Sequence, residues 1–141
     1  MIDRYKSNDV IESLEDVAYK NGITILDVYD LDKSTSDCVI MSVKTVFMNY
    51  SYDKVSYAFR LAHEISHILF GNPESQNVYY FSECGKRGEE FEAHKNAIEM
   101  LMKIKRPTTV QTFMEAYSIP SWLSEYVEID YRRSNEYSKT R

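Results

Sequence analysis

The sequence predicts an α+β fold in which a small antiparallel sheet packs against a helical core, with short helices at the C-terminal end. Two patterns indicate this fold: apolar residues recur at helical spacing over several stretches, and β-branched and aromatic residues dominate three short stretches between polar breaks. The length of 141 residues and the hydrophobic fraction of 43% suit one compact domain. We therefore expect these elements to share a single core.

The N-terminal part of the chain predicts one helix followed by strands. Apolar residues at helical spacing from Asp9 to Lys20 indicate an amphipathic helix, and Asn21-Gly22 is typical of a helix end. Three stretches then combine β-branched and aromatic residues: ITILDVYDL, CVIMSV and TVFMNY. Polar segments such as DKSTSD separate them, which favours a small antiparallel sheet.

The spacing becomes helical again in the stretch SYDKVSYAFRLAHEISHILFGNP. Its apolar stripe consists of Val55, Ala58, Ala62, Ile65 and Leu69. Ser51 or Asp53 is the expected N-terminal cap, and Gly71-Asn72-Pro73 ends the helix. Residues 74–88 include VYYF and ECGKRG and follow no consistent pattern. The sequence therefore predicts a helix here but no definite conformation for the segment after it.

The stretch GEEFEAHKNAIEMLMKIK predicts a further helix, which ends before Pro107. Its apolar side consists of Phe91, His94, Ala97, Ile98, Leu101 and Ile104. The remaining sequence, TVQTFMEAYSIPSWLSEYVEIDYR, predicts two shorter helices joined near Ser118 to Ser121. We therefore expect a core domain in residues 1–105 and a helical extension in residues 106–141 that packs on the same domain.

Charge and hydropathy argue against several classes of protein. The net charge of −5 disfavours a surface that follows nucleic acid, because phosphate binding depends on clustered lysine and arginine. No apolar run approaches the ~20 residues that span a bilayer, and the opening MIDRYKSNDV carries charges where a signal peptide has an apolar core. We therefore expect a cytoplasmic protein without membrane contact, in which Cys38 and Cys84 are free, buried thiols.

The five residues HEISH carry the strongest chemical signal in the chain. His63 and His67 are one helical turn apart, which is the spacing at which two imidazoles converge on a zinc ion. Glu64 projects from the same helix, where it can accept a proton from a water molecule that attacks a peptide carbonyl. A chance H-E-x-x-H in a chain of this composition is expected at on the order of half a percent. The pattern therefore favours a metal site over a solvated helix surface.

A catalytic zinc site needs a third protein ligand. The extended form H-E-x-x-H-x-x-G-x-x-H is excluded, because Gly71 comes one place late and no third histidine follows. The next helix offers Glu89, Glu90, Glu92 and His94. Helical periodicity alone favours His94, which lies on the apolar side, although a buried histidine bonded to backbone is the alternative. Glu92 lies on the polar side of that helix.

The stretch RLAHEISHILFG followed by EFEAHKNAIEMLM resembles the ImmA/IrrE family of metallopeptidases. In the family motif AHELGH, the matching residues are Ala62, His63, Glu64 and His67. In the family motif E-x-E-A-N-x-F-A-A-x-L-L-M-P, they are Glu90, Glu92, Ala93, Ala97, Leu101 and Met102. The family's Asn, Phe and final Pro are replaced here by His94, Asn96 and Lys103. The resemblance implies a zincin-like core and makes Glu92 the third zinc ligand.

The function implied by this resemblance is that of a zinc-dependent endopeptidase. His63, His67 and Glu92 would hold Zn²⁺, and Glu64 would act as general base and acid. The VYYF stretch offers Tyr79 or Tyr80 to stabilise the oxyanion, although aromatic packing is the favoured role for both. Members of the family are often encoded on phages or integrative elements beside a helix-turn-helix repressor. They relieve repression by cleaving that repressor or promoting its cleavage. We therefore expect such a repressor as the protein substrate.

Two other functions compete with this one. A metal-stabilised regulatory protein, an anti-repressor, could hold or displace its partner without proteolysis. Alternatively, the C-terminal helices could form a DNA-reading helix-turn-helix, but Glu125, Glu128 and Asp130 in the second of them would repel phosphates. We therefore expect those helices to pack on the core and the protein not to bind nucleic acid directly.

Overall fold

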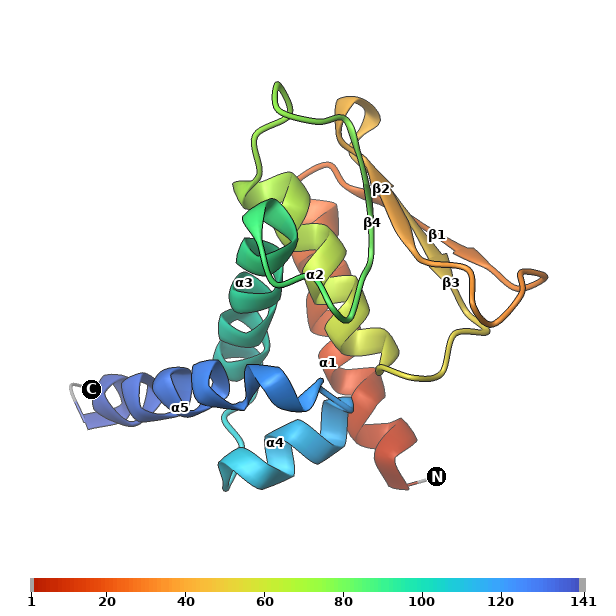
Figure 1. Ribbon diagram of the computed structural model, residues 1–141. Helices are drawn as coiled ribbons and strands as arrows, with labels where there is room; N and C mark the ends of the chain where they lie inside the picture. The colour runs from red at the N-terminus through yellow and green to blue at the C-terminus, as the bar shows by residue number, and fades with distance from the viewer. Residues whose placement is uncertain (1, 140–141) are drawn as a thin grey trace.

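The computed structural model describes residues 2–139, and the side chains of residues 9–134. These residues form an α+β fold with five α-helices and one four-stranded sheet. The helices are α1 (Ile2–Lys20), α2 (Tyr57–Phe70), α3 (Gly88–Ile104), α4 (Val110–Tyr117) and α5 (Ser124–Lys139). Figure 1 shows the sheet on one side of α2 and α3 on the other, with α4 and α5 crossing below. The α+β class predicted from the sequence is confirmed.

The sheet is mixed, with the strand order β1-β3-β2-β4. Its strands are β1 (Thr24–Val28), β2 (Cys38–Ile40), β3 (Thr45–Asn49) and β4 (Val78–Tyr80). β2 is antiparallel to both β3 and β4, but β1 and β3 are parallel. The prediction of an antiparallel sheet is therefore wrong for one pair. The reason is that the chain loops back after β1 before it enters β2, so the tight turn from β2 to β3 gives β3 the direction of β1.

Most of the predicted helix boundaries agree with the structure. α1 ends before Gly22, which has a φ of 70° that glycine adopts without steric cost, but α1 begins well before the predicted residue Asp9. The cap of α2 is neither Ser51 nor Asp53. The side chain of Ser56 accepts the hydrogen bond from the backbone N–H of Phe59, because Ser56 directly precedes the first helical turn.

α2 is the central helix of the fold. Every residue from 58 to 67 is buried, since the sheet, α1, α3 and α4 all contact this helix. Its polar side chains, Arg60, His63, Glu64, Ser66 and His67, therefore lie inside the protein. Buried charged and polar groups need partners or a ligand. α2, which carries HEISH, therefore brings the candidate metal-binding side chains into the core.

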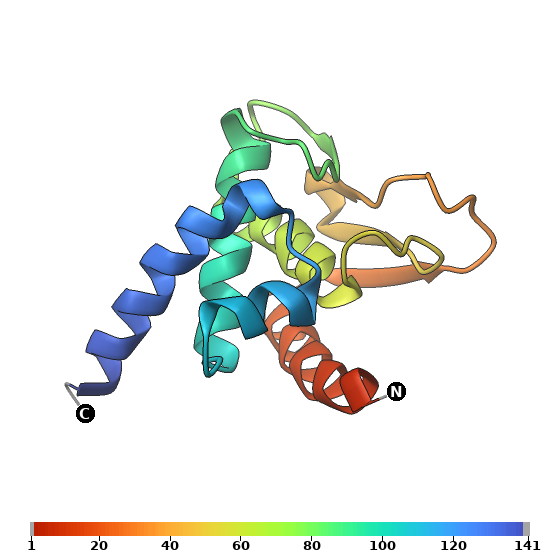
Figure 2. The same cartoon turned by 60° about the horizontal axis from the view of Figure 1, so that its bottom comes forward.

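The C-terminal helices close the other end of the core. Ser118, with a φ of 50°, and a short 3-10 turn at Ser121–Leu123 join α4 to α5, where the sequence predicts the junction. α5 is longer than predicted and lies against α3, on the side away from the sheet (Figure 2).

Both cysteines are free, as predicted, but Cys38 is half-buried and Cys84 is exposed. Within residues 2–139, no helix has the length and hydropathy to cross a bilayer.

Candidate metal centre

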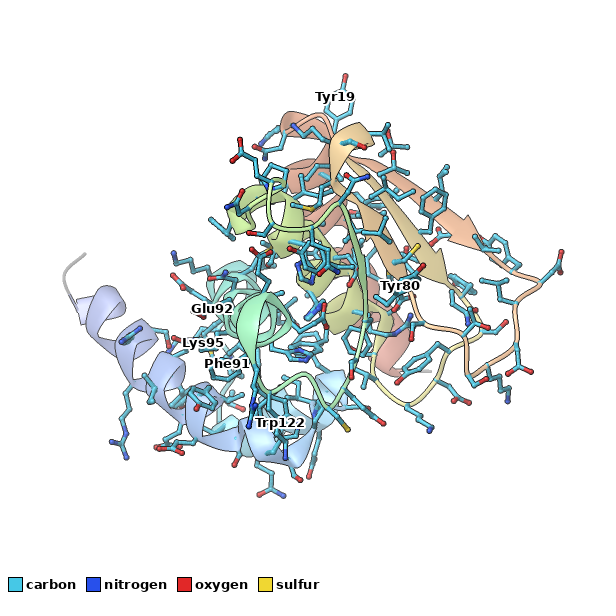
Figure 3. The ribbon with its side chains drawn as sticks, turned by 45° about the horizontal axis from the view of Figure 1, so that its top comes forward. Tyr19, Tyr80, Phe91, Glu92, Lys95 and Trp122 are labelled. Atoms are coloured by element: carbon cyan, nitrogen blue, oxygen red, sulfur yellow. The ribbon has the colours of Figure 1, made fainter. Side chains whose placement is uncertain are left out.

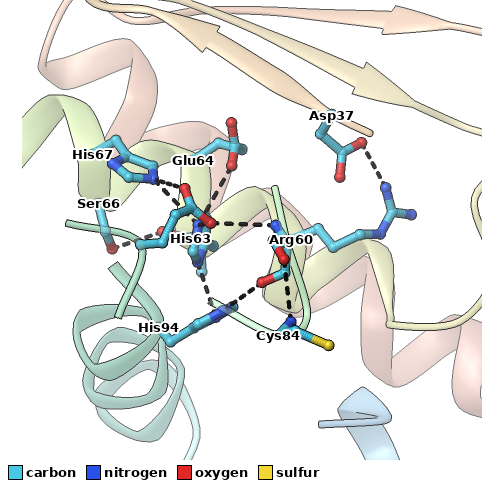
Figure 4. Close-up of polar contacts among 11 residues, drawn as sticks. Asp37, Arg60, His63, Glu64, Ser66, His67, Cys84 and His94 are labelled. Carbon is cyan, nitrogen blue, oxygen red and sulfur yellow. Dashed lines mark hydrogen bonds and ion pairs between the residues drawn. The ribbon is translucent and has the colours of Figure 1, made fainter. Parts of the chain in front are cut away.

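The two histidines of α2 point toward one another in the interior. His63 is fully buried, His67 is 1% exposed, and their Nε2 atoms lie 3.2 Å apart. One turn of helix brings the rings this close, as the spacing predicts. Figure 4 shows both rings on the same side of the helix, with Glu64 beside them. The two Nε2 atoms are therefore close enough to bind the same metal ion.

Glu90, in the first turn of α3, supplies a third atom at that point. Its carboxylate lies 2.7 Å from Nε2 of His67 and 3.1 Å from Nε2 of His63. The ligand atoms of these three residues all lie within 4.8 Å of one another. Two histidine nitrogens and one carboxylate oxygen form a donor set that zinc accepts in catalytic sites. Because its side chain is 20% exposed, Glu90 forms the side of this group that faces solvent.

Glu92 does not take part in this group. Its side chain is 59% exposed and forms an ion pair with Lys95, with a distance of 2.9 Å between Oε2 and Nζ. Figure 3 shows Glu92 and Lys95 on the outer side of α3. Residues two apart on a helix differ by roughly 200° in direction, so Glu90 and Glu92 face opposite ways. Glu90 therefore stands where the motif resemblance predicts Glu92.

Glu64 is buried beside the group without a partner of its own. It is 0% exposed, its Oε1 lies 3.7 Å from Nε2 of His63, and neither of its carboxylate oxygens accepts a hydrogen bond from the described residues. Burial raises the pKa of Glu64 well above its usual value, and the nearby carboxylate of Glu90 acts in the same direction. A buried carboxyl group with two unpartnered oxygens indicates that a ligand belongs next to it.

The charges of the group also fit a cation. Burial lowers the pKa of His63, so its ring is neutral at pH 7. Burial would raise the pKa of Glu90, but the neighbouring His63 and His67 outweigh this effect and lower the pKa to about 2. The point where the three side chains meet is therefore rich in lone pairs and poor in protons. A divalent metal ion would satisfy these lone pairs together, so the residues fit a zinc ion.

Aromatic residues of β4 and the following segment cover the histidines. Tyr79 stacks on His67 with ring centroids 4.3 Å apart, and Phe81 meets His63 edge-on at 5.0 Å. Burial raises the pKa of Tyr79, and the neighbouring carboxylate of Glu89 acts in the same direction. Tyr80 is 63% exposed and faces solvent (Figure 3). Neither hydroxyl is bonded to the three-residue group, so a role in stabilising the oxyanion stays a prediction.

His94 lies behind His63 and is not part of the three-residue group. The Nδ1 atoms of His94 and His63 are 3.1 Å apart, and Nε2 of His94 donates to the carbonyl oxygen of Ser82 at 2.8 Å. Burial lowers the pKa of His94 to about 3, so this ring is also neutral. His94 is therefore a buried histidine bonded to backbone, the alternative to a metal ligand that the sequence left open.

Only the metal group and its motifs relate this chain to known proteins. No family model, curated protein or solved structure matches the chain. The resemblance to the ImmA/IrrE family is therefore carried by the motifs alone, and the geometry of His63, Glu64, His67 and Glu90 carries the chemical argument.

Proposed function

We propose that the protein is a zinc-dependent endopeptidase in which His63, His67 and Glu90 hold the metal and Glu64 moves the protons. The observation that carries this proposal is the convergence of two imidazole nitrogens and a carboxylate beside a buried carboxyl group that has no hydrogen-bond partner among the described residues. Three protein ligands are typical of catalytic zinc, because the fourth position serves water or substrate. A structural zinc site would normally take four protein ligands.

The chemistry divides between the ion and Glu64. A zinc ion held here would polarise a peptide carbonyl and lower the pKa of a water molecule. Glu64 is adjacent to His63 and can accept the proton of the attacking water, then deliver it to the leaving amine. The raised pKa of Glu64 suits a group that must hold a proton between these two steps. Burial keeps other protons and competing hydrogen-bond donors away from its carboxyl group.

Two features next to the metal group support a peptide as the substrate. β4 pairs with β2 on one side and is an edge strand, and its Tyr79 stacks on His67. An extended peptide can add to such an edge by backbone hydrogen bonds. A hollow of about 120 Å³ also lies between α2 and α3, with His67 and Phe70 among its walls. This hollow can receive a side chain of the substrate next to a metal ligand.

The substrate we propose is a helix-turn-helix repressor of a prophage or integrative element. This part of the proposal comes from the resemblance of the two motifs to the ImmA/IrrE family, whose members act on such repressors. Cleavage would relieve repression of the element. This role does not require the protein to contact nucleic acid.

The test is to express the protein together with the product of the neighbouring gene, the proposed repressor, and to look for fragments of that product. The wild-type protein should produce them, and Glu64→Gln should abolish them while it still binds zinc, because Glu64 is not a ligand. Glu99→Gln is the matched control, since Glu99 is an exposed glutamate of the same helix that pairs with Lys103 and does not line the hollow, and it should cleave normally. Relief of repression by Glu64→Gln without fragments would replace the peptidase with a binding anti-repressor.

A further inference from the structure

His94 is held rigidly against the back of His63. The ring of His94 is fully buried, and Phe59 stacks on it with a 5° angle between the ring planes. Phe81 and Trp122 meet the same ring edge-on. His63 therefore has a nitrogen facing His94 on one side, its Nδ1, while its Nε2 faces Glu90 on the other. Packing fixes the geometry of this contact before any metal binds.

The backbone decides where the proton of His94 lies. Its Nε2 is 2.8 Å from the carbonyl oxygen of Ser82, and a carbonyl oxygen can only accept, so Nε2 carries the proton. A neutral imidazole protonated on Nε2 has a lone pair on Nδ1. This lone pair accepts a hydrogen bond from Nδ1–H of His63 at 3.1 Å. His63 is then left with a lone pair on Nε2, the atom that faces the metal group.

The Ser82 carbonyl is itself fixed. It also accepts a hydrogen bond from the backbone N–H of Gly85 at 3.1 Å, and the indole N–H of Trp122 donates to the next carbonyl, that of Glu83, at 2.8 Å. The backbone N–H of Ser82 donates to the Glu90 carboxylate at 3.2 Å. One residue of this turn therefore orients two ligands, Glu90 directly and His63 through His94.

We propose that His94 is a positioning residue that holds His63 in the Nδ1–H tautomer, so that Nε2 is free to bind zinc. This inference rests on the proposed metal centre and adds to it a residue that touches neither the ion nor the substrate. Hydrogen bonds to ligating histidines of this kind are worth about 10–100-fold in metal affinity. The ImmA/IrrE motif has Asn at this position, so the use of a histidine is a feature of this chain.

The first test compares zinc affinities of the wild type, His94→Leu and His94→Asn by competition with a chromophoric chelator. Leucine removes the acceptor, and affinity should fall about 10–100-fold. Asparagine places its Oδ1 near the position of Nδ1 and keeps an acceptor for His63, so it should recover most of the loss. A folded His94→Leu protein that binds zinc as tightly as the wild type would overturn the inference while leaving the peptidase proposal intact.

The second test reads the tautomer directly and depends on no variant. Long-range ¹H–¹⁵N NMR of the imidazoles in the metal-free wild type should show the His94 proton on Nε2. A His94 proton on Nδ1 would overturn the inference, because His94 would then donate to Nδ1 of His63 and leave the His63 proton on Nε2, the atom that must bind zinc. A wild-type protein that binds no zinc at all would instead defeat the proposed function, and the role of His94 with it.

Discussion

Replacing Asp37 with alanine should destabilise the protein strongly, because Arg60 would lose its counter-charge inside the core. The side chains of Arg60 and Asp37 are 1% and 0% exposed, and they meet at 2.7 Å (Figure 4). The guanidinium group also donates to the carbonyl oxygens of Val55, Asn49 and Tyr52. Arginine cannot lose its proton in a protein, so its charge stays buried in the variant.

The magnitude follows from what the Asp37 carboxylate does. Its Oδ1 accepts from Arg60 and from the backbone N–H of Asn49, both at 2.7 Å. Burial raises the pKa of Asp37, and the charge of Arg60 reverses this only in part, so the pair is not strongly stabilising in itself. Breaking such a pair from one side nevertheless costs about 3–5 kcal/mol. A domain of this length has roughly 7–20 kcal/mol of stability in total.

Urea unfolding of the metal-free protein, followed by the fluorescence of the single Trp122, measures this loss. Asp37→Ala should lower the midpoint by roughly 2 M, given a typical m value of about 2 kcal/mol per M. Asp37→Asn is the control: it keeps an oxygen acceptor for both donors and should lose less. A loss below about 1 kcal/mol for Asp37→Ala would mean that water reaches Arg60 and that the pair is not buried in solution.

Three further predictions concern single elements. Ser56→Ala removes the cap of α2 and should cost about 1 kcal/mol in the free energy of unfolding, measured by urea titration. Gly71→Ala places a Cβ 2.4 Å from the carbonyl oxygen of His67, so it should cost about 1–3 kcal/mol; an unchanged stability would show that the end of α2 yields easily. Burial raises the pKa of Asp130, with Glu99 acting in the same direction. As the pH rises above the unfolded value of 3.8, the unfolded chain releases this proton first, so wild-type stability falls through that window. Asp130→Asn should therefore gain stability relative to wild type between pH 3.5 and 7, and parallel pH profiles would contradict this.

The local part of the site could be predicted from the sequence, and the part that depends on packing could not. The convergence of His63 and His67 follows from one turn of helix, which needs no knowledge of the rest of the fold. The third residue comes from another helix, so its choice depends on how α3 is rotated against α2. The motif resemblance selected Glu92, but periodicity already placed His94 on the inward side. Glu90, four residues before His94, shares that side, and this was the signal that could have identified it.

In the sheet and the core, too, the local features could be predicted from the sequence and the features that depend on packing could not. β-branched composition predicted β1, β2 and β3, but the direction of each strand depends on the path of the chain between them. The burial of Arg60 had no local signal, since a charged residue in a helix is usually exposed and its partner Asp37 lies in a distant loop. β4 has three residues, as β2 does, but it lies in residues 74–88, where glycines and polar residues interrupt any consistent pattern.

The most direct test of the metal centre is a zinc titration of the metal-free wild type, Glu90→Gln and Glu92→Gln against a competing chelator. The wild type should bind one zinc ion per chain. Glu90→Gln should bind it about 100-fold more weakly or worse, which is about 2.7 kcal/mol, and Glu92→Gln should match the wild type. A wild type that binds no zinc, or a loss confined to Glu92→Gln, would contradict the site formed by His63, His67 and Glu90.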